Sequence, residues 1–502
     1  MTGQTSGHET GQVKSLGTLG LTAKNGRRAM ISGLAVDSRQ VKDGYLFAAL
    51  PGTQVHGGEF IKYALRMGAA AILTDATGAR IAKAELDASD AALIVAQDPR
   101  QTLAYCSALW FGQQPEHMVA VTGTNGKTSV AVFLRQIWSE LDFAAINIGT
   151  TGVEGAYEVP LAHTTPEPIT LHRILRDAAR AGVTHGAMEA SSHGLAQRRL
   201  DGVVLQAAGF TNFSQDHLDY HKHFEDYFDA KAGLFNRVLP DNGVAVINTD
   251  DSKGFKMSLI AKERGIATIS VGKEEGSDLR IENQRFGLTG QEVRFRWKRR
   301  SHQARLDLIG GFQAENVMLA AGLAIACGAE AEAVFDTLPH LKTVRGRMQL
   351  AATRANGAAV FVDFAHTPDA VKTALAAMRP HVLGRLIVVL GAGGDRDPTK
   401  RVLMGAAAAQ NADVVYVTDD NPRSEDPATI RAAVMEGAPE AYNVGDRAEA
   451  ILRAVDALEA GDALLIAGKG HESGQIVGDD ILPFDDVEQA SVAVAALDGK
   501  LA

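Results

Sequence analysis

The segment that most constrains this chain is residues 122–129, TGTNGKTS, which lies between a strand-like run and a helix-like run. The apolar residues 118–122 predict a buried strand, and apolar side chains spaced by three and four residues over 130–141 predict one face of a helix. A glycine turn at such a junction brings backbone N–H groups and the positive end of the helix onto phosphate oxygens. We therefore predict a phosphate-binding loop in a parallel sheet wrapped by helices.

The side chains of this loop support that interpretation. Lys127 adds a full positive charge, and Thr128 has a hydroxyl that can reach Mg²⁺. The common pattern G-x-x-x-x-G-K-[ST] would need glycine at Val121, so the loop is a shortened variant. An ordinary strand-to-helix turn is the alternative, and a lysine between glycine and threonine argues against it. The predicted phosphate-binding residues are Gly123, Thr124, Asn125, Gly126, Lys127, Thr128 and Ser129.

The chain length of 502 residues corresponds to about three typical domains. Short apolar runs alternate with Gly-rich or Asp-rich loops, which predicts an α/β protein. A breaker at 112–115 marks the first boundary, and the predicted domains are residues 1–115, 116–343 and 344–502. The strands predicted in the last two domains are 118–122, 186–189, 207–211, 244–248, 358–363, 386–391, 414–418 and 463–468. Ligands of such sheets bind beyond the carboxyl ends of the strands.

Composition narrows the functional classes. The balance of 50 Lys and Arg against 60 Asp and Glu gives a net charge of -10, which argues against broad nucleic-acid binding. No stretch approaches the roughly 20 apolar residues that span a bilayer, and residues 1–17 lack an apolar signal region, so we expect a cytoplasmic protein without a membrane span. Cys106 and Cys327 lie in apolar surroundings and are interpreted as buried thiols in a reducing compartment.

Ten motifs in a fixed order extend the interpretation. They are TGTNGKTS, HTTPEP (163–168), MEASSHGLAQRR (188–199), FTNFSQDHLDYH (210–221), YFDAKAGLF (227–235), VRGRM (344–348), DFAHTPDA (363–370), GGDRD (393–397), DDNPR (419–423) and GKGHE (468–472). Over about residues 34–490 the chain thereby resembles the Mur ligases of peptidoglycan synthesis. Within that family it is most similar to the members that add meso-diaminopimelate to UDP-N-acetylmuramoyl-L-alanyl-D-glutamate.

The resemblance implies a fold, a reaction and a set of partners. It implies an N-terminal α/β UDP-binding domain, a central P-loop ATPase-like domain with a parallel sheet, and a C-terminal Rossmann-like domain that binds the amino acid. The family phosphorylates a substrate carboxylate with ATP, and an amine then attacks the acyl phosphate to form an amide. The expected partners are UDP-N-acetylmuramoyl-dipeptide, meso-diaminopimelate and ATP, with Mg²⁺ as cofactor. We expect a monomer.

Candidate metal ligands follow the predicted strands. Glu189 ends one strand and His217 follows another, and a carboxylate and an imidazole beside a phosphate loop suit Mg²⁺. The residues alone leave open a surface or capping carboxylate and a structural histidine. Lys231 lies on an apolar helical stretch, where it would be interpreted as a lysine whose amine reaches the solvent. The resemblance instead implies a carbamylated Lys231 that helps Glu189, His217 and Thr128 to hold Mg²⁺.

The resemblance also assigns the remaining contacts to nucleotides. It places Asn316 at adenine, Arg347 at the γ-phosphate and Asp363 at ribose, and it makes Lys127, Lys231 and Arg347 the catalytic groups. Gln313 stands where relatives often have asparagine, which affects the local hydrogen bonding. The alternatives are Arg345 and Arg347 as solvated linker charges, Ser38 as a turn cap, and 164–165 as an extended lead into Pro166. The residues implied for the UDP substrate are Val36, Ser38, Thr53, Gln54, Val55, Thr164, Thr165, Ser191, Gln197 and Arg199.

Selection of the amino acid is implied in the last domain. The implied residues are Arg396, Asp420, Asn421, Pro422, Arg423, Gly468 and Glu472. A planar guanidinium can clamp a carboxylate through two hydrogen bonds, which makes Arg423 the discriminator against lysine, since lysine has no distal carboxylate. The string 420–423 is also good turn chemistry, and a turn and a site are compatible. A lysine-adding ligase, a folylpolyglutamate synthetase and a nucleotide sensor without turnover are the rival functions.

Overall fold

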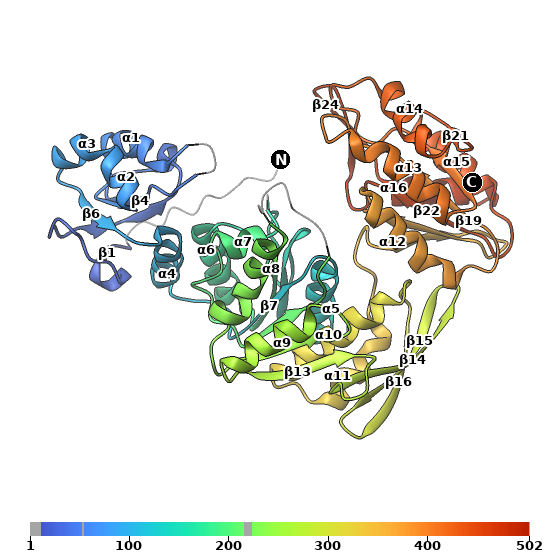
Figure 1. Ribbon diagram of the computed structural model, residues 1–502, viewed down its shortest axis with the longest axis horizontal. Coiled ribbons are helices and arrows are strands. Elements are labelled where there is room, and N and C mark those ends of the chain that lie inside the picture. Colours follow the sequence, from blue (N-terminus) through green and yellow to red (C-terminus); the bar gives the residue numbers. More distant parts are fainter. Residues whose placement is uncertain (1–11, 53–54, 162, 215–222, 501–502) are drawn as a thin grey trace. The chain divides into compact units, whose positions relative to one another are not determined.

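The computed structural model describes residues 12–52, 55–161, 163–214 and 223–500 (Figure 1). It contains two compact units, Met1–Ile269 with Leu323–Gly328, and Ser270–Gly322 with Ala329–Ala502. Both units combine helices with mainly parallel sheets, so the predicted α/β class is confirmed. The domain limits at 115/116 and 343/344 stay predictions. Across the described residues, no helix combines the length and the apolar character that crossing a membrane requires.

The first unit begins with a small parallel sheet of order β3-β4-β5-β6. Its strands are β3 (Gly33–Ala35), β4 (Tyr45–Ala48), β5 (Ala71–Thr74) and β6 (Ala92–Val95), preceded by the antiparallel pair β1 (Lys14–Ser15) and β2 (Met30–Ile31). Its helices are α1 (Ile61–Arg66), α2 (Ala76–Ile81), α3 (Lys83–Asp87) and α4 (Pro99–Phe111). Alternating residues of β4 enter different cores, Leu46 with Trp110 of α4 and Phe47 with Ile61 of α1, so both faces of the sheet are covered.

A larger sheet of this unit has the strand order β12-β11-β7-β10-β8-β9, in which only β9 runs antiparallel to its neighbour. The strands are β7 (His117–Thr122), β8 (Ala145–Gly149), β9 (Gly152–Gly155), β10 (His185–Glu189), β11 (Ala207–Phe210) and β12 (Val244–Asn248). The helices between them are α5 (Lys127–Glu140), α6 (Pro168–Arg180), α7 (Ser192–Ala196), α8 (Phe224–Gly233) and α9 (Gly254–Glu263), and a π-helical turn, Leu234–Val238, follows α8. Since β7 lies between β10 and β11, the loops after these three strands meet at one edge.

The second unit contains an antiparallel ribbon and a mainly parallel sheet. The ribbon consists of β14 (Leu279–Gly287), β15 (Gly290–Trp297) and β16 (Arg300–Leu306), and β13 (Ala267–Gly272), α10 (Phe312–Ala326) and α11 (Ala331–Thr337) flank it in sequence. The sheet has the order β17-β18-β22-β19-β20-β21, with β17 antiparallel at its edge. These strands are β17 (Gln349–Thr353), β18 (Ala359–Asp363), β19 (Leu386–Leu390), β20 (Val414–Val417), β21 (Tyr442–Asn443) and β22 (Ala463–Ala467).

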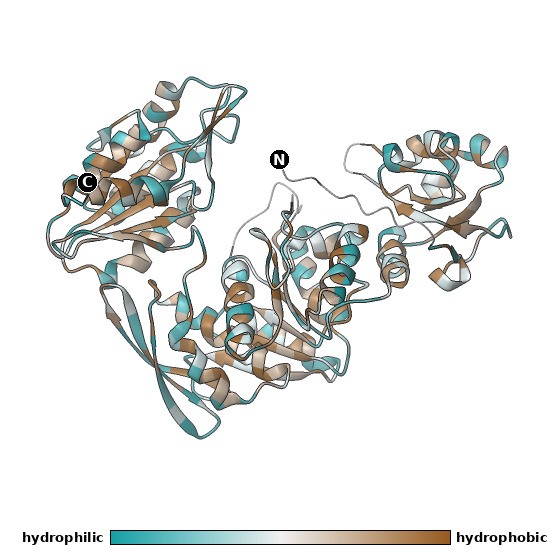
Figure 2. Ribbon diagram, turned by 180° about the vertical axis from the view of Figure 1, so that it is seen from behind, coloured by the Kyte–Doolittle hydropathy of each residue, from teal (hydrophilic) through white to brown (hydrophobic). Residues whose placement is uncertain are grey.

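Helices cover both faces of this last sheet. Val388 belongs to a core with Leu375 of α12 (Pro368–Met378), and Val389 belongs to another with Ile451 of α15 (Arg447–Asp456). The remaining helices are α13 (Thr399–Asn411), α14 (Pro427–Gly437) and α16 (Asp486–Leu497), and an antiparallel hairpin joins β23 (Gly474–Val477) to β24 (Asp480–Pro483). Figure 2 shows the apolar strands at the centre of these layers. A sheet buried on both faces leaves its polar chemistry to the loops at the strand ends.

Burial shifts the pKa values of two cysteines and two histidines in this protein. Cys106 and Cys327 are both buried, and burial raises the pKa of each thiol to about 12, so neither is ionised near neutral pH. Burial also lowers the pKa of His172 on α6 to about 4, and burial together with the neighbouring His117 lowers the pKa of His185 to about 4. Both histidines are therefore neutral in the folded protein at pH 7.

Because of these two histidines, we expect the stability of the first unit to decrease at acidic pH. Unfolding returns each pKa to about 6.5, so the unfolded chain binds more protons as the pH falls below that value. The free energy of unfolding is therefore unaffected by these histidines above pH 6.5 and decreases as the pH falls towards 4. At pH 5 the decrease is about 2 kcal/mol for each histidine. The urea midpoint followed by tryptophan fluorescence should fall between pH 7 and pH 5, and His172→Leu should flatten that dependence. An unchanged pH dependence in this variant would contradict the burial argument.

Candidate functional site

The loop between β7 and α5 is held in a conformation that needs glycine. Gly123 has φ 148° and Gly126 has φ 84°. A Cβ atom at Gly123 would lie 1.8 Å from the Thr211 hydroxyl, so a larger residue would push the two loops apart. The backbone at this position therefore lies directly against the loop that follows β11.

Hydrogen bonds from the β11 loop fix the tip of the glycine loop. The Thr211 hydroxyl donates to the Asn125 carbonyl at 2.6 Å, and the Asn125 N–H donates to Asn212 Oδ1 at 2.9 Å. The Thr124 N–H donates to the Asn212 carbonyl at 2.9 Å. These contacts within the protein already shape the loop, which lowers the entropic cost of ordering it around a ligand.

Two lysine ammonium groups converge on one carbonyl of this loop. Lys127 Nζ lies 3.1 Å from the Gly123 oxygen and 2.8 Å from the Thr124 oxygen. Lys231 of α8 donates to the same Gly123 oxygen at 2.7 Å and lies 4.4 Å from the centroid of the Tyr227 ring. Lys231 is only 1% exposed, so the interpretation as a lysine that reaches the solvent is wrong. Its carbamylation stays a prediction.

Glu189 is a buried carboxylate beside the same loop. It ends β10 and is 2% exposed. Its Oε2 accepts from the Thr128 hydroxyl at 3.0 Å, and its Oε1 accepts from the Thr150 N–H at 2.7 Å. At Gly149 a Cβ atom would lie 2.0 Å from Glu189 Oε1, so the neighbouring strand leaves room for the carboxylate. The alternatives of a surface or helix-capping carboxylate are wrong for Glu189.

The donor atoms at this point suit Mg²⁺. Thr128 and Glu189 offer hydroxyl and carboxylate oxygens next to the predicted phosphate loop, and Mg²⁺ is usually held by one or two carboxylates together with phosphates and water. Among the described residues there is no cluster of three or more His, Cys, Asp or Glu side chains that could hold a metal alone. His217, the other predicted ligand, lies outside the described residues.

The residues predicted between 164 and 199 form one polar cluster next to Glu189. The Thr165 hydroxyl lies 2.9 Å from the Glu189 carbonyl and 3.1 Å from the Ser191 hydroxyl. Arg199 donates to the Thr165 carbonyl at 2.6 Å and to Gln197 Oε1 at 2.9 Å. The hydroxyls of Thr164 and Thr150 are 3.1 Å apart, which ties the cluster to the Glu189 carboxylate through the Thr150 backbone. The structure therefore brings these predicted residues together.

The predicted positions in the first sheet are more dispersed. Val36 and Ser38 are half-buried and follow β3, whereas Val55 is exposed. Asp37, not Ser38, caps the short helix Ser38–Gln40, because its carboxylate accepts from the Arg39 N–H. The alternative of Ser38 as a cap is therefore wrong. Thr53 and Gln54 lie outside the described residues.

The second unit places Arg347 and Asp363 close together. Asp363 ends β18 and accepts from the N–H groups of Met348 at 2.7 Å and Ala365 at 2.9 Å. Burial raises the pKa of this carboxyl, and the Arg347 charge opposes that rise. The Arg347 guanidinium lies 4.9 Å from the centroid of the Phe364 ring, so it packs on an aromatic face and is not a freely solvated charge.

Asn316, the residue predicted to contact adenine, lies on α10 and bonds to another residue of the same helix. Its side-chain amide donates to Gln313 Oε1 at 3.1 Å, and both residues are buried. Gln313 thus has a defined local role as a hydrogen-bond acceptor. The contact of Asn316 with adenine stays a prediction.

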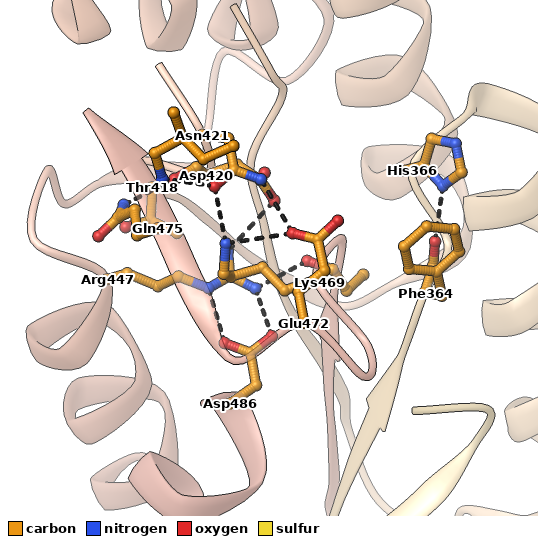
Figure 3. Close-up of polar contacts among 12 residues, drawn as sticks. Phe364, His366, Thr418, Asp420, Asn421, Arg447, Lys469, Glu472, Gln475 and Asp486 are labelled. Carbon is orange, nitrogen blue, oxygen red and sulfur yellow. Dashed lines mark hydrogen bonds and ion pairs between the residues drawn. The ribbon is translucent and has the colours of Figure 1, made fainter. Parts of the chain in front are cut away.

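The loops after β20 and β22 bring the predicted amino-acid residues together (Figure 3). Asn421 Nδ2 donates to Glu472 Oε2 at 2.9 Å, and Asn421 Oδ1 accepts from the Ile476 N–H at 2.9 Å. Gly468 has φ 119°, and a Cβ atom there would lie 2.5 Å from Asp420 Oδ2. Close approach of the two loops therefore depends on glycine at 468.

Arg423 is held by backbone contacts of its own. It adopts φ 53°, and its N–H donates to the Ile476 carbonyl at 3.1 Å while Gly478 donates back to the Arg423 carbonyl at 2.8 Å. Its Nη1 donates to the Gly394 carbonyl at 2.8 Å. Pro422 is buried and Arg396 is exposed. Left-handed backbone outside glycine is strained, and such strain is typical of functional sites.

Sequence reasoning missed three buried charged residues beneath this site. Lys469 lies inside GKGHE and donates to Asn421 Oδ1 at 2.9 Å, so its place in that motif was the available signal. Arg447 and Asp486 are both fully buried and form a bidentate pair at 2.8 and 2.7 Å. They are 39 positions apart in the chain, and no local pattern indicates their pairing.

Comparison with known proteins matches each part of the chain. The Mur ligase family, catalytic domain, matches residues 30–110, the Mur ligase middle domain matches 121–324, and the Mur ligase, glutamate ligase domain, matches 346–470. The UDP-N-acetylmuramoyl-L-alanyl-D-glutamate--2,6-diaminopimelate ligase of Bradyrhizobium diazoefficiens is 47% identical over 93% of this chain and 95% of its own. The ligase of the same name from Zymomonas mobilis is 45% identical over 97% of this chain and 100% of its own.

Solved structures agree with these relatives. A structure of UDP-N-acetylmuramoyl-L-alanyl-D-glutamate--2,6-diaminopimelate ligase has a TM-score of 0.71 and 33% identity, and covers 93% of this chain and 95% of its own. MurF ligase from Thermotoga maritima in complex with ADP has a TM-score of 0.58 at 17% identity, covers 93% of this chain and 98% of its own, and shows likeness of fold alone. Three Mur ligase family models match successive parts of the chain between residues 30 and 470, and a named relative is 47% identical to it. The chain therefore belongs to the Mur ligase family.

Proposed function

We propose that this protein is an ATP-dependent ligase that adds meso-2,6-diaminopimelate to UDP-N-acetylmuramoyl-L-alanyl-D-glutamate, a step in the synthesis of peptidoglycan precursors. The observation that carries this proposal is the 47% identity, over 93% of the chain, to a ligase named for these two substrates. Two arrangements support the proposal. The glycine loop with Lys127 and Glu189 offers groups that can bind ATP phosphates and Mg²⁺. The pair of Asn421 and Glu472 offers polar groups that can bind an amino acid.

The proposed first step transfers the γ-phosphoryl group. An oxygen of the D-glutamate side-chain carboxylate attacks the γ-phosphorus of ATP, the bond to ADP breaks, and an acyl phosphate forms. Lys127, the loop N–H groups and Arg347 hold the phosphates and offset the charge that spreads over the transferred group. Mg²⁺, held by Thr128 and Glu189 with His217 and a carbamate on Lys231, would add further positive charge at the phosphates.

The proposed second step forms the amide. The neutral diaminopimelate amine attacks the acyl carbon, the nitrogen releases a proton to the solvent, and phosphate leaves with the oxygen that came from the carboxylate. We assign Thr164, Thr165, Ser191, Gln197 and Arg199 to the nucleotide-peptide substrate, because their hydroxyl, amide and guanidinium groups lie together beside Glu189. We assign the group around Asn421, Arg423 and Glu472 to the amino acid. A cytoplasmic location and a monomeric state stay predictions.

The proposal is tested by phosphate release with purified protein, ATP and Mg²⁺. Release should need both the nucleotide dipeptide and meso-diaminopimelate, and lysine should be a poor substitute. Efficient use of lysine would favour the lysine-adding ligase, and glutamate incorporation onto folate would favour a folylpolyglutamate synthetase. ATP hydrolysis that needs neither acceptor, or nucleotide binding without release, would refute the proposed ligase.

A further inference from the structure

Lys469 is a charged residue in the interior of the second unit. Its side chain is fully buried in the turn that follows β22, and its ammonium lies 2.9 Å from Asn421 Oδ1 and 3.4 Å from Glu472 Oε2 (Figure 3). A buried ammonium is costly unless it is paired and hydrogen-bonded, and its interactions are stronger there than in water. Its two partners are the residues assigned above to the amino acid.

Lys469 determines which way the Asn421 amide points. Asn421 Oδ1 accepts from both Lys469 Nζ and the Ile476 N–H, so Nδ2 faces Glu472. A flipped amide would place its NH₂ group against these two donors, which is unfavourable. The orientation of Asn421 therefore depends on Lys469 together with one backbone group.

Lys469 also provides a positive charge next to the Glu472 carboxylate. The Glu472 side chain is 38% exposed, so its carboxylate lies between the solvent and the buried ammonium. Without that ammonium, Glu472 would lose its ion pair with Lys469 and keep only the charge interaction with the buried Arg447, so its carboxylate would turn more readily towards water. The carboxylate then becomes a less ordered acceptor.

A second pair anchors both loops from below. Arg447 binds Asp486 and also donates to the carbonyl of Ala467, the last residue of β22, at 3.0 Å. Its Nη1 lies 4.0 Å from Asp420 Oδ2, next to Asn421. Arg447 and Asp486 thus hold the ends of β20 and β22 at a set spacing, and Lys469 connects the side chains above them.

We propose that Lys469 is a positioning residue for the amino-acid acceptor, which makes Asn421 and Glu472 an ordered donor and acceptor pair for one zwitterionic end of diaminopimelate. This inference rests on the proposed function and adds to it the residue that prepares this part of the site. Lys469 acts through Asn421 and Glu472 and does not itself contact the substrate.

The test compares two substitutions of Lys469 in the full-length protein. Lys469→Met keeps the length of the side chain and removes both the charge and the donors, whereas Lys469→Gln keeps one donor group. We expect Lys469→Met to raise KM for diaminopimelate about 10- to 100-fold, the effect of losing hydrogen bonds to a charged group. KM for ATP and for the nucleotide dipeptide should not change, and Lys469→Gln should recover part of the loss.

A double-mutant cycle separates positioning from stability. If Lys469 acts through Glu472, Lys469→Met should change KM for diaminopimelate much less in the Glu472→Gln background. Lys372→Met, at an exposed position on α12, is the matched control. Additive effects, an unchanged KM for diaminopimelate, or loss of folding in both Lys469 variants would overturn the inference. Failure of the proposed function is separate, since wild-type protein would then release phosphate without diaminopimelate.

Discussion

Replacing Lys127 by alanine should lower kcat for ATP-dependent ligation about 10²- to 10³-fold, the usual effect of removing one charge that stabilises a transition state. In the structure the ammonium already lies within the glycine loop, 2.8 Å from the Thr124 carbonyl, so it needs little rearrangement to meet a phosphate. The Lys127 side chain is half-buried, and its hydrogen bonds to the Gly123 and Thr124 carbonyls contribute little net stability, so we expect the thermal midpoint to fall little.

The control for this change is Lys62→Ala, which removes an exposed lysine from α1. Steady-state phosphate release with both acceptors measures kcat, and thermal unfolding monitors the fold. If Lys127→Ala retained wild-type kcat, the loop would not be the site of phosphoryl transfer. A large fall in the thermal midpoint would instead assign Lys127 to stability.

Replacing Arg423 by alanine should reduce the preference for diaminopimelate over lysine about 100-fold or more, as expected for the loss of a bidentate pair between a guanidinium and a carboxylate. The Arg423 backbone N–H and carbonyl bond to Ile476 of β23 and to Gly478 just after it, and Nη1 donates to the Gly394 carbonyl, so the guanidinium has a set direction. A distal carboxylate can therefore be bound without first ordering the arginine.

Arg423→Lys is the matched variant because it keeps the charge and loses the planar fork. It should fall between wild type and Arg423→Ala in kcat/KM for diaminopimelate. KM for ATP should not change in either variant. An unchanged ratio of kcat/KM for diaminopimelate and lysine in Arg423→Ala would remove Arg423 from amino-acid selection.

Local patterns were sufficient for the part of the molecule that surrounds the nucleotide loop. The strand predicted at 118–122 is β7 (117–122), and Glu189 ends β10 as expected. The helix predicted over 130–141 is α5 (127–140), which ends one residue earlier than predicted. These features depend on short-range periodicity and on glycine at a strand-to-helix junction, and both are visible in a single sequence.

Local sequence patterns did not predict which charged side chains are buried or which distant residues pair. The apolar neighbours of Lys231 allowed an amine that reaches the solvent, whereas the structure buries it against Gly123, a residue 108 positions away. Arg447 and Asp486 likewise pair the first residues of α15 and α16, and Lys469 pairs with Asn421 between the loops that follow β22 and β20. Such contacts depend on how the elements pack in three dimensions, which the sequence pattern alone left open.

The central claim, that the D-glutamate carboxylate is activated by direct phosphorylation, is tested most directly with that carboxylate labelled with oxygen-18. The protein is incubated with ATP, Mg²⁺, meso-diaminopimelate and the labelled nucleotide dipeptide, and the released phosphate is analysed by mass spectrometry. The account predicts one labelled oxygen in each phosphate, because the acyl phosphate retains a carboxylate oxygen when the amine displaces phosphate. Phosphate that carries no label while the amide product forms would contradict it.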